Sequence, residues 1–140
     1  MYSYQIIAIV IAAMLLLVQI SEPSDAFSAE ASTDAVLEIS KGKASYYGRN
    51  HHGKKTASGE RFDQNALTAA HPRWPFDTMV RVVNLANGKD ATVRIVDRGP
   101  AKKAQRRGVI IDVSTRAAKA LGFIKQGKTA VRLEVLRWGE

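Results

Sequence analysis

The stretch that decides the fold lies in the second half of the chain and reads Thr92-Val93-Arg94-Ile95-Val96-Asp97-Arg98-Gly99-Pro100. Val93 and Ile95 alternate with polar or charged neighbours, which is typical of a half-buried β-strand that ends here at a Gly-Pro turn signal. Asp97 therefore stands at the end of a rigid strand, and positions of this kind can raise the pKa of a carboxylic acid and make it a proton donor. The local pattern alone favours a structural role, in which Asp97 pairs with Arg98 or caps the turn.

The charge of the chain is distributed unevenly. The 140 residues suit one ordinary domain, and the formal net charge is +8. Residues 1–40 contain no Lys or Arg, whereas residues 41–140 hold all 21 basic residues against eight acidic ones, a net charge of +13. We expect this region to be attracted to polyanions, among which nucleic acid, acidic lipid and anionic cell-wall polymers all qualify.

The N-terminal segment has the features of an export signal. Residues 6–20 are apolar except for Gln19, a run that suits a signal peptide and is short for a membrane span. Small residues at Ser24 and Ala26 predict a signal peptide over residues 1–26, although an uncleaved anchor is the alternative because no Lys or Arg precedes the apolar run. Residues 27–40 are small, acidic and unpatterned, which predicts a flexible linker before a folded domain at residues 41–140.

The chain contains no cysteine. This excludes a disulfide scaffold, a thiolate metal site, a cysteine nucleophile and a lipid-anchored N-terminal cysteine. We expect an exported, monomeric protein of the periplasm or cell wall that is not a lipoprotein and that meets the membrane only through its N-terminal segment, if that segment stays uncleaved.

The folded region is predicted to be mostly β. Asn87-Gly88 indicates a hairpin turn between two alternating runs, and Ser114 and Gly122 are suited to cap a short helix over residues 115–121. In the last strand we expect Glu134 to point outward to solvent. Strands are predicted at 43–48, 79–84, 92–96, 109–113 and 130–138, with 65–70 ambiguous between strand and helical turn. Five or six short strands with one or two helices favour a closed or nearly closed β-barrel.

Several segments, in this order and spacing, resemble the RlpA family. They are Gly42–Gly48, His52–Phe62, Leu67–His71, Val80–Leu85 with Asn87-Gly88, Val93–Pro100 and Ile110–Ser114. The resemblance implies a six-stranded double-psi β-barrel, a fold shared with expansins, barwin-type proteins and some endoglucanases. It also implies lytic transglycosylase activity on the glycan strands of peptidoglycan, notably strands stripped of stem peptides, with no cofactor. Members are typically lipoproteins and many carry a peptidoglycan-binding repeat domain, two features that this sequence does not show.

By motif, the resemblance implies three functional residues: Glu60 of Ser-Gly-Glu, His71 of Ala-Ala-His and Asp97 of Asp-Arg-Gly-Pro. A lytic transglycosylase needs one group that serves first as acid and then as base, because the muramic acid C6 hydroxyl attacks in place of water. Elimination among the eight acids of residues 41–140 also leaves Glu60 and Asp97, with Asp112 interpreted as structural. We expect Asp97 to be the general acid/base, Glu60 to tune it by like-charge repulsion, and His71 to orient or polarise one of the two.

The remaining expectations concern binding. Tyr47, His52, Thr56 and Arg98 are expected to contact the substrate, and whether Arg98 also pairs with Asp97 is left open by the sequence. Adjacent histidines such as His51 and His52 rarely bind one ion together, and no ligand cluster accompanies them, so no metal site is expected.

Two alternatives to the enzyme remain. One is a non-catalytic, expansin-like module that binds or loosens the cell wall with the same groove. The other is an exported nucleic-acid binder, suggested by the charge but not expected, because the region lacks a patterned basic helix or an aromatic stripe.

Overall fold

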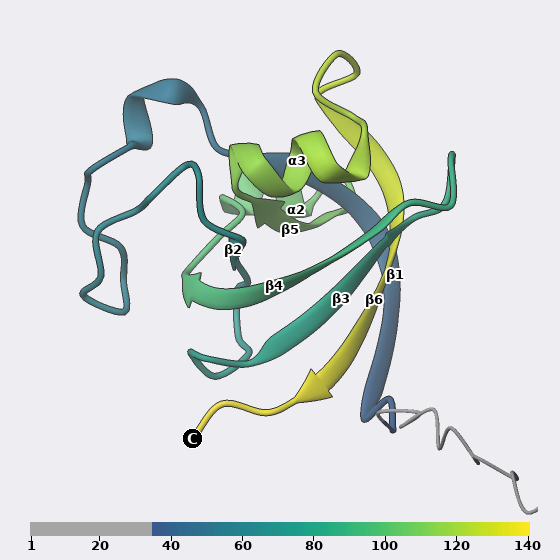
Figure 1. Cartoon of the computed structure of the whole chain (residues 1–140), viewed down its shortest axis with the longest axis horizontal. Coiled ribbons are helices and arrows are strands. Elements are labelled where there is room, and N and C mark those ends of the chain that lie inside the picture. The colour runs from purple at the N-terminus through teal and green to yellow at the C-terminus, as the bar shows by residue number, and fades with distance from the viewer. Residues whose placement is uncertain (1–34) are drawn as a thin grey trace, which may run out of the picture. The chain divides into compact units, whose positions relative to one another are not determined.

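The computed structural model describes residues 35–140, so the predicted signal peptide and the first part of the predicted linker lie outside the described residues (Figure 1). The described part is a closed barrel with the strand order β1-β5-β2-β4-β3-β6. Its strands are β1 (Glu38–Tyr46), β2 (Thr68–Ala70), β3 (Met79–Asn84), β4 (Asp90–Asp97), β5 (Val109–Val113) and β6 (Lys128–Arg137). The predicted six-stranded barrel is confirmed. Between residues 35 and 140 the structure contains no helix of the length and apolarity that crossing a membrane requires.

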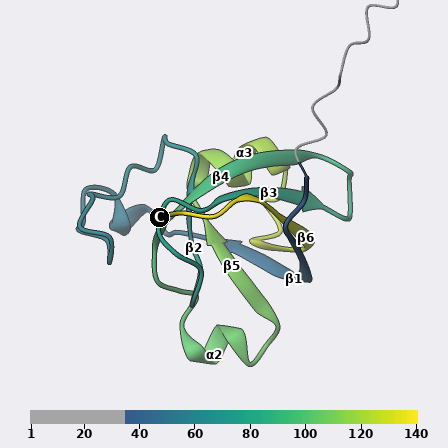
Figure 2. The same cartoon turned by 90° about the horizontal axis from the view of Figure 1, so that it is seen from below.

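Two parallel strand pairs shape the barrel. β1 runs parallel to β5, and β2 runs parallel to β4, while the other four neighbouring pairs are antiparallel. Because β2 and β4 are parallel, their carboxyl ends lie together at one rim of the barrel. Figure 2 shows the strands of the barrel from below. His71 follows β2 directly and Asp97 ends β4, and the backbone N–H of His71 donates to the Asp97 carbonyl at 3.2 Å. The topology thus places two of the predicted site residues next to each other.

The barrel interior is filled by alternate residues of the strands. In β3 and β4, Val80, Val82, Val93 and Ile95 are fully buried, as the period-2 pattern predicts. Helix α3 (Thr115–Leu121) packs its Ala117, Ala118 and Leu121 against this core.

Helix α3 begins and ends where the sequence predicts. The hydroxyl of Ser114 accepts from the Ala117 N–H at 3.2 Å, and Gly122 ends the helix in the left-handed conformation at φ 74°. Both predicted caps are therefore confirmed.

Three elements differ from the sequence prediction. β1 begins at Glu38, inside the segment expected to be a linker, because residues 38–45 pair continuously with β6. A short helix η1 (Arg49–His51) opens the long loop after β1, and α2 (Lys102–Gln105) interrupts the segment predicted as a basic loop. The start of β1 is exposed on both faces, so no hydrophobic pattern marked it; its backbone pairing with a distant strand makes it a strand.

Glu134 lies on the outward face of β6, as predicted, but its side chain is only 4% exposed because two arginines cover it. Arg81 of β3 donates to both carboxylate oxygens of Glu134, at 2.7 and 3.1 Å. Arg132, which lies on β6 like Glu134, donates to Oε1 at 3.2 Å. The hydrogen bonds from Arg81 hold the pKa of Glu134 below its usual range. An outward carboxylate on a barrel is thus buried by its long cationic neighbours.

Candidate active site

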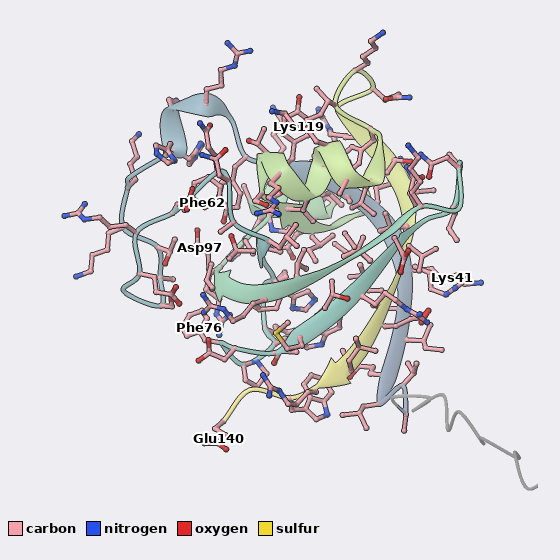
Figure 3. The ribbon with its side chains drawn as sticks, in the orientation of Figure 1. Lys41, Phe62, Phe76, Asp97, Lys119 and Glu140 are labelled. Atoms are coloured by element: carbon pink, nitrogen blue, oxygen red, sulfur yellow. The ribbon has the colours of Figure 1, made fainter. Side chains whose placement is uncertain are left out.

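Asp97 lies at the rim of the barrel, half-buried at the end of β4, on the side that faces the loop over residues 47–67 (Figure 3). Its Oδ1 accepts from the backbone N–H groups of Ala57 and Arg98, both at 2.8 Å, and its Oδ2 accepts from the Tyr47 hydroxyl at 2.6 Å. The loop is fastened to the strand by a further bond from the Ser58 N–H to the Val96 carbonyl. Three of about four acceptor sites of a carboxylate are taken, so the group is held in one orientation.

Tyr47 is a fixed donor to this carboxylate. It follows β1, and its ring packs on Phe62 with 4.3 Å between the ring centroids. Burial, reinforced by the hydrogen bond to Asp97, raises the pKa of the Tyr47 hydroxyl far above its usual range. The hydroxyl therefore keeps its proton. The sequence predicted Tyr47 as a substrate contact, whereas the structure places its hydroxyl on the candidate acid.

Glu60 lies on the same loop but pairs with a different strand residue. Arg94 of β4 binds both of its carboxylate oxygens, at 2.7 and 2.8 Å, and also binds Asp77 at 2.8 Å. The hydrogen bond from Arg94 lowers the pKa of Glu60, which is ionised at neutral pH. Because Arg94 compensates the charge of Glu60, repulsion from Glu60 is a weak means of tuning Asp97.

On the glycan substrate that the family resemblance implies, we expect Glu60→Gln to lower the cleavage rate about tenfold, because it breaks a bidentate ion pair that positions the loop carrying Ala57. The matched variant is Arg94→Gln, which removes the same ion pair from the other side and should lower the rate by a similar factor. Initial rates on purified glycan strands measure both. A Glu60 variant much slower than the Arg94 variant would show that Glu60 acts on the substrate directly.

His71 is buried at 7% exposure and its ring stacks on Trp74 with 3.8 Å between centroids. Its Nδ1 accepts from the backbone N–H groups of Arg73 and Trp74 at 3.2 and 3.0 Å, so its proton is on Nε2. Burial, together with the charges of Arg73 and Arg98, lowers the pKa of His71 to about 4. His71 is therefore a neutral donor near pH 7, suited to orient a neighbour or a sugar hydroxyl and unsuited to carry charge.

The side chain of Arg98 turns away from Asp97. Its guanidinium lies 4.0 Å from the centre of the Phe76 ring and donates to the Trp74 carbonyl at 2.9 Å. Only its backbone N–H contacts the Asp97 carboxylate. The question that the sequence left open is thus answered: Arg98 supports the loop after β2 and does not pair with Asp97.

Asp112, which the sequence predicts to be structural, lies near Asp97. It lies on the outer face of β5, directly opposite Ser45 of β1 and Ala70 of β2, and the Ser45 hydroxyl donates to its Oδ1. Burial raises the pKa of Asp112, and the nearby charge of Asp97 raises it further. The like-charge partner of Asp97 is therefore Asp112 and not Glu60.

The raised pKa of Asp112 predicts a pH-dependent stability. The folded domain holds the Asp112 proton more tightly than the unfolded chain, so this stabilisation is present at low pH and is lost as the pH rises through the folded pKa. Asp112→Asn removes the ionised form and leaves an oxygen for Ser45, so we expect Tm at pH 7 to rise by a few degrees, with the difference vanishing at low pH. Thermal melts of both proteins from pH 3 to pH 8 would measure this. If the variant is less stable than the wild type at every pH, the prediction is wrong, and the Asp112 carboxyl group makes a stabilising contact that an amide cannot replace.

Two hollows are lined by residues that adjoin Asp97, although Asp97 itself lines neither. One, of about 630 Å³, is lined by Tyr46, Tyr47, Arg49, His52 and residues of α3. The other, of about 760 Å³, is lined by His71, Arg98, Gly99 and residues of α2. Tyr47 donates a hydrogen bond to Asp97, and Arg98 follows Asp97 in the chain.

Two predicted contacts have other partners. The Thr56 hydroxyl donates to the Glu60 carbonyl at 2.8 Å and lies 2.9 Å from the Ser58 hydroxyl, so it stabilises the loop. His52 lines the first hollow, and its Nδ1 accepts from the Gln64 N–H at 3.2 Å. Within residues 35–140 no three His, Cys, Asp or Glu side chains are grouped to hold a metal ion.

Comparison with known proteins identifies the fold and the family of this barrel. The closed topology, with its two parallel pairs and a carboxylate at the rim, defines a double-psi β-barrel domain. A family model described as "Lytic transglycolase" matches residues 39–133, and the chain belongs to that family.

The relatives in sequence carry one name. The chain is 48% identical over 105 residues to "Endolytic peptidoglycan transglycosylase RlpA" of Campylobacter jejuni, which covers 75% of this chain and 37% of that protein. It is also 48% identical over 102 residues to a "Probable endolytic peptidoglycan transglycosylase RlpA" of Synechocystis, covering 73% of this chain and 30% of the relative. The matched part of the chain thus spans about a third of the length of these curated relatives.

Solved structures share the fold at low identity. A Streptomyces papain inhibitor superposes with a TM-score of 0.57 at 21% identity, over 74% of this chain and 98% of the inhibitor. A Clavibacter michiganensis expansin mutant in complex with cellohexaose superposes with a TM-score of 0.56 at 15% identity, over 71% of this chain and 51% of the expansin. At these identities the likeness concerns the fold.

Proposed function

We propose that this domain is an endolytic lytic transglycosylase that cleaves the bond between N-acetylmuramic acid and N-acetylglucosamine in peptidoglycan glycan strands. The observation that carries the proposal is the placement of Asp97, a carboxylate oriented by three donors at the barrel rim, whose neighbours Tyr47 and Arg98 each line a hollow. Membership of the lytic transglycosylase family and the RlpA relatives support it.

The reaction needs one acid/base group. Asp97, once protonated, donates its proton to the glycosidic oxygen as the bond from that oxygen to the muramic acid C1 breaks. The C6 hydroxyl of the same sugar then attacks C1, forming a 1,6-anhydro ring, and its proton passes to Asp97. The carboxyl group ends as it began, and no water is consumed.

The neighbouring groups assist this cycle. The Tyr47 hydroxyl and two backbone N–H groups hold the carboxylate in place after it has donated its proton. His71 supplies a neutral N–H at the adjacent strand end.

Product analysis tests the proposal. Purified glycan strands, with and without stem peptides, are digested with the protein and the fragments are weighed by mass spectrometry. We expect internal cleavage with 1,6-anhydromuramyl ends, which lack the mass of one water relative to hydrolysis products. Binding without any cleavage would assign the domain the expansin-like, non-catalytic role. Fragments with reducing ends would assign it to hydrolysis.

We further propose that the protein acts outside the cytoplasm as a monomer, preferring strands stripped of stem peptides. The glycan substrate lies outside the cytoplasmic membrane, and the closed barrel leaves no strand edge for pairing with a second copy within residues 35–140. Cell fractionation and light scattering of the purified protein test location and mass. Comparison of cleavage rates on stripped and peptide-bearing strands tests the preference.

A further inference from the structure

The hollow between the loop after β2 and helix α2 is cationic. Among the residues that line its volume of about 760 Å³ are Arg73, Arg98 and Lys102, together with His71 and Gln105, and no Asp or Glu is among them. Figure 2 shows α2 projecting from the barrel beside β5. The hollow is lined by Arg98, the residue that follows Asp97. Three positive charges meet at one concave surface.

These charges are not compensated by the described part of the protein. None of Arg73, Arg98 and Lys102 is in an ion pair with a residue between 35 and 140. Two of them, Arg73 and Arg98, add to the effect of burial in lowering the pKa of His71, which lines the same hollow.

The hollow also has a preformed wall. Arg98 is fixed by its bond to the Trp74 carbonyl and by the Phe76 ring, and the Gln105 amide donates to the Pro100 carbonyl at 2.8 Å. A ligand in the hollow therefore meets one oriented guanidinium, that of Arg98, and two further cationic side chains, those of Arg73 and Lys102. Charge-assisted bonds from such donors favour a carboxylate over a neutral sugar hydroxyl.

We infer that this hollow is a carboxylate-binding subsite of the glycan groove, and that it selects strands by a carboxylate carried next to the cleaved bond. The inference rests on the proposed function for the identity of the polymer, because muramic acid bears such a group. In a stripped strand the carboxylate is that of the lactyl ether on the sugar ring. In a peptide-bearing strand the lactyl group is an amide, and the carboxylates belong to the stem peptide.

Binding measurements on the full chain carrying Asp97→Asn, which prevents turnover, test this subsite. Titration calorimetry compares four hexasaccharides of equal length: a stripped muramic acid strand, the same strand with its lactyl carboxylates amidated by methylamine, a peptide-bearing strand, and a neutral N-acetylglucosamine oligomer. We expect at least one carboxylate-bearing strand to bind about tenfold more tightly than the two neutral oligomers. The stronger of the two identifies the lactyl or the peptide carboxylate as the ligand.

The double variant Arg73→Gln/Lys102→Gln should abolish this tenfold preference and leave the affinity for the neutral oligomers unchanged. The matched control is Lys103→Gln with Lys41→Gln, which removes two exposed charges that line neither hollow, one on α2 and one on β1. Equal binding of charged and neutral strands, or an equal loss of preference in the control, would overturn the subsite.

The subsite and the proposed activity can fail separately. A preference for carboxylates that depends on Arg73 and Lys102, in a protein that never produces anhydro ends, would keep the subsite and reject the transglycosylase. Anhydro ends formed by a protein that binds neutral and charged strands alike would keep the activity and reject the subsite.

Discussion

Asp97→Asn should lower the rate of glycan-strand cleavage by about 10²–10⁴-fold, the range that general acid–base catalysis supplies, while Tm changes by no more than a few degrees. An amide cannot donate and recover a proton at the glycosidic oxygen. Its oxygen can still accept from the Ala57 and Arg98 N–H groups, and the Tyr47 hydroxyl can rotate to accept from the amide. The fold therefore survives the change that removes the chemistry.

The control for this variant lies on the same strand. Asp90 begins β4 and is exposed, so Asp90→Asn makes the same chemical change far along the strand from the rim. Its cleavage rate should equal that of the wild type. An Asp97 variant that unfolds would assign the carboxylate a structural role at the turn, and one that retains most of its activity would move the acid/base role to another group.

Trp74→Ala should destabilise the domain by about 3 kcal/mol and lower Tm by more than about 10 °C. The Trp74 ring is 8% exposed, packs into the barrel core and forms the stacking surface for His71. The Trp74 N–H donates to His71 and the Trp74 carbonyl accepts from Arg98, so a backbone shift at Trp74 would also displace these two side chains. Differential scanning calorimetry measures the loss.

A second tryptophan, Trp138, provides the control for the Trp74→Ala variant. Trp138 meets Trp74 edge-on at 6.1 Å between ring centroids but is 38% exposed. Trp138→Ala should lower Tm by much less, since less area is returned to water. Similar losses in the two variants would mean that the edge contact, and not burial of Trp74, holds this corner of the barrel.

Those parts of the fold that depend on local pattern could be predicted from the sequence. The β3–β4 hairpin, the α3 helix and both its caps follow from alternation, from Asn-Gly and from the Ser114 and Gly122 signals. The strand that carries Asp97 could be predicted because it alternates strongly and its end is marked by Gly-Pro, whereas the role predicted for Asp97 came from the family motif and from elimination among the acids. Each of these signals lies within a few residues of the feature that it specifies.

The rest depends on contacts between distant residues. Asp112 was assigned a structural role because an apolar strand with one carboxylate does not reveal which neighbours its outer face meets; only the β1-β5-β2 order places it near Asp97. The Glu60–Arg94 ion pair joins residues 34 positions apart, and Glu134 is buried by an arginine of another strand. The periodicity of the sequence does not predict such pairings.

The place of β6 in the barrel also determines how the domain can fold. β6 is the last strand to be synthesised, yet it pairs with β1, the first, along eight residue pairs and with β3 along six. Until residues 128–137 are available, β1 and β3 each have an unpaired edge, and the barrel has no smaller closed form. Contacts between such distant strands form slowly because a long loop must be closed first. A nascent chain should therefore remain open until its final strand emerges and then acquire its rim, its core and its candidate active site in one late cooperative step.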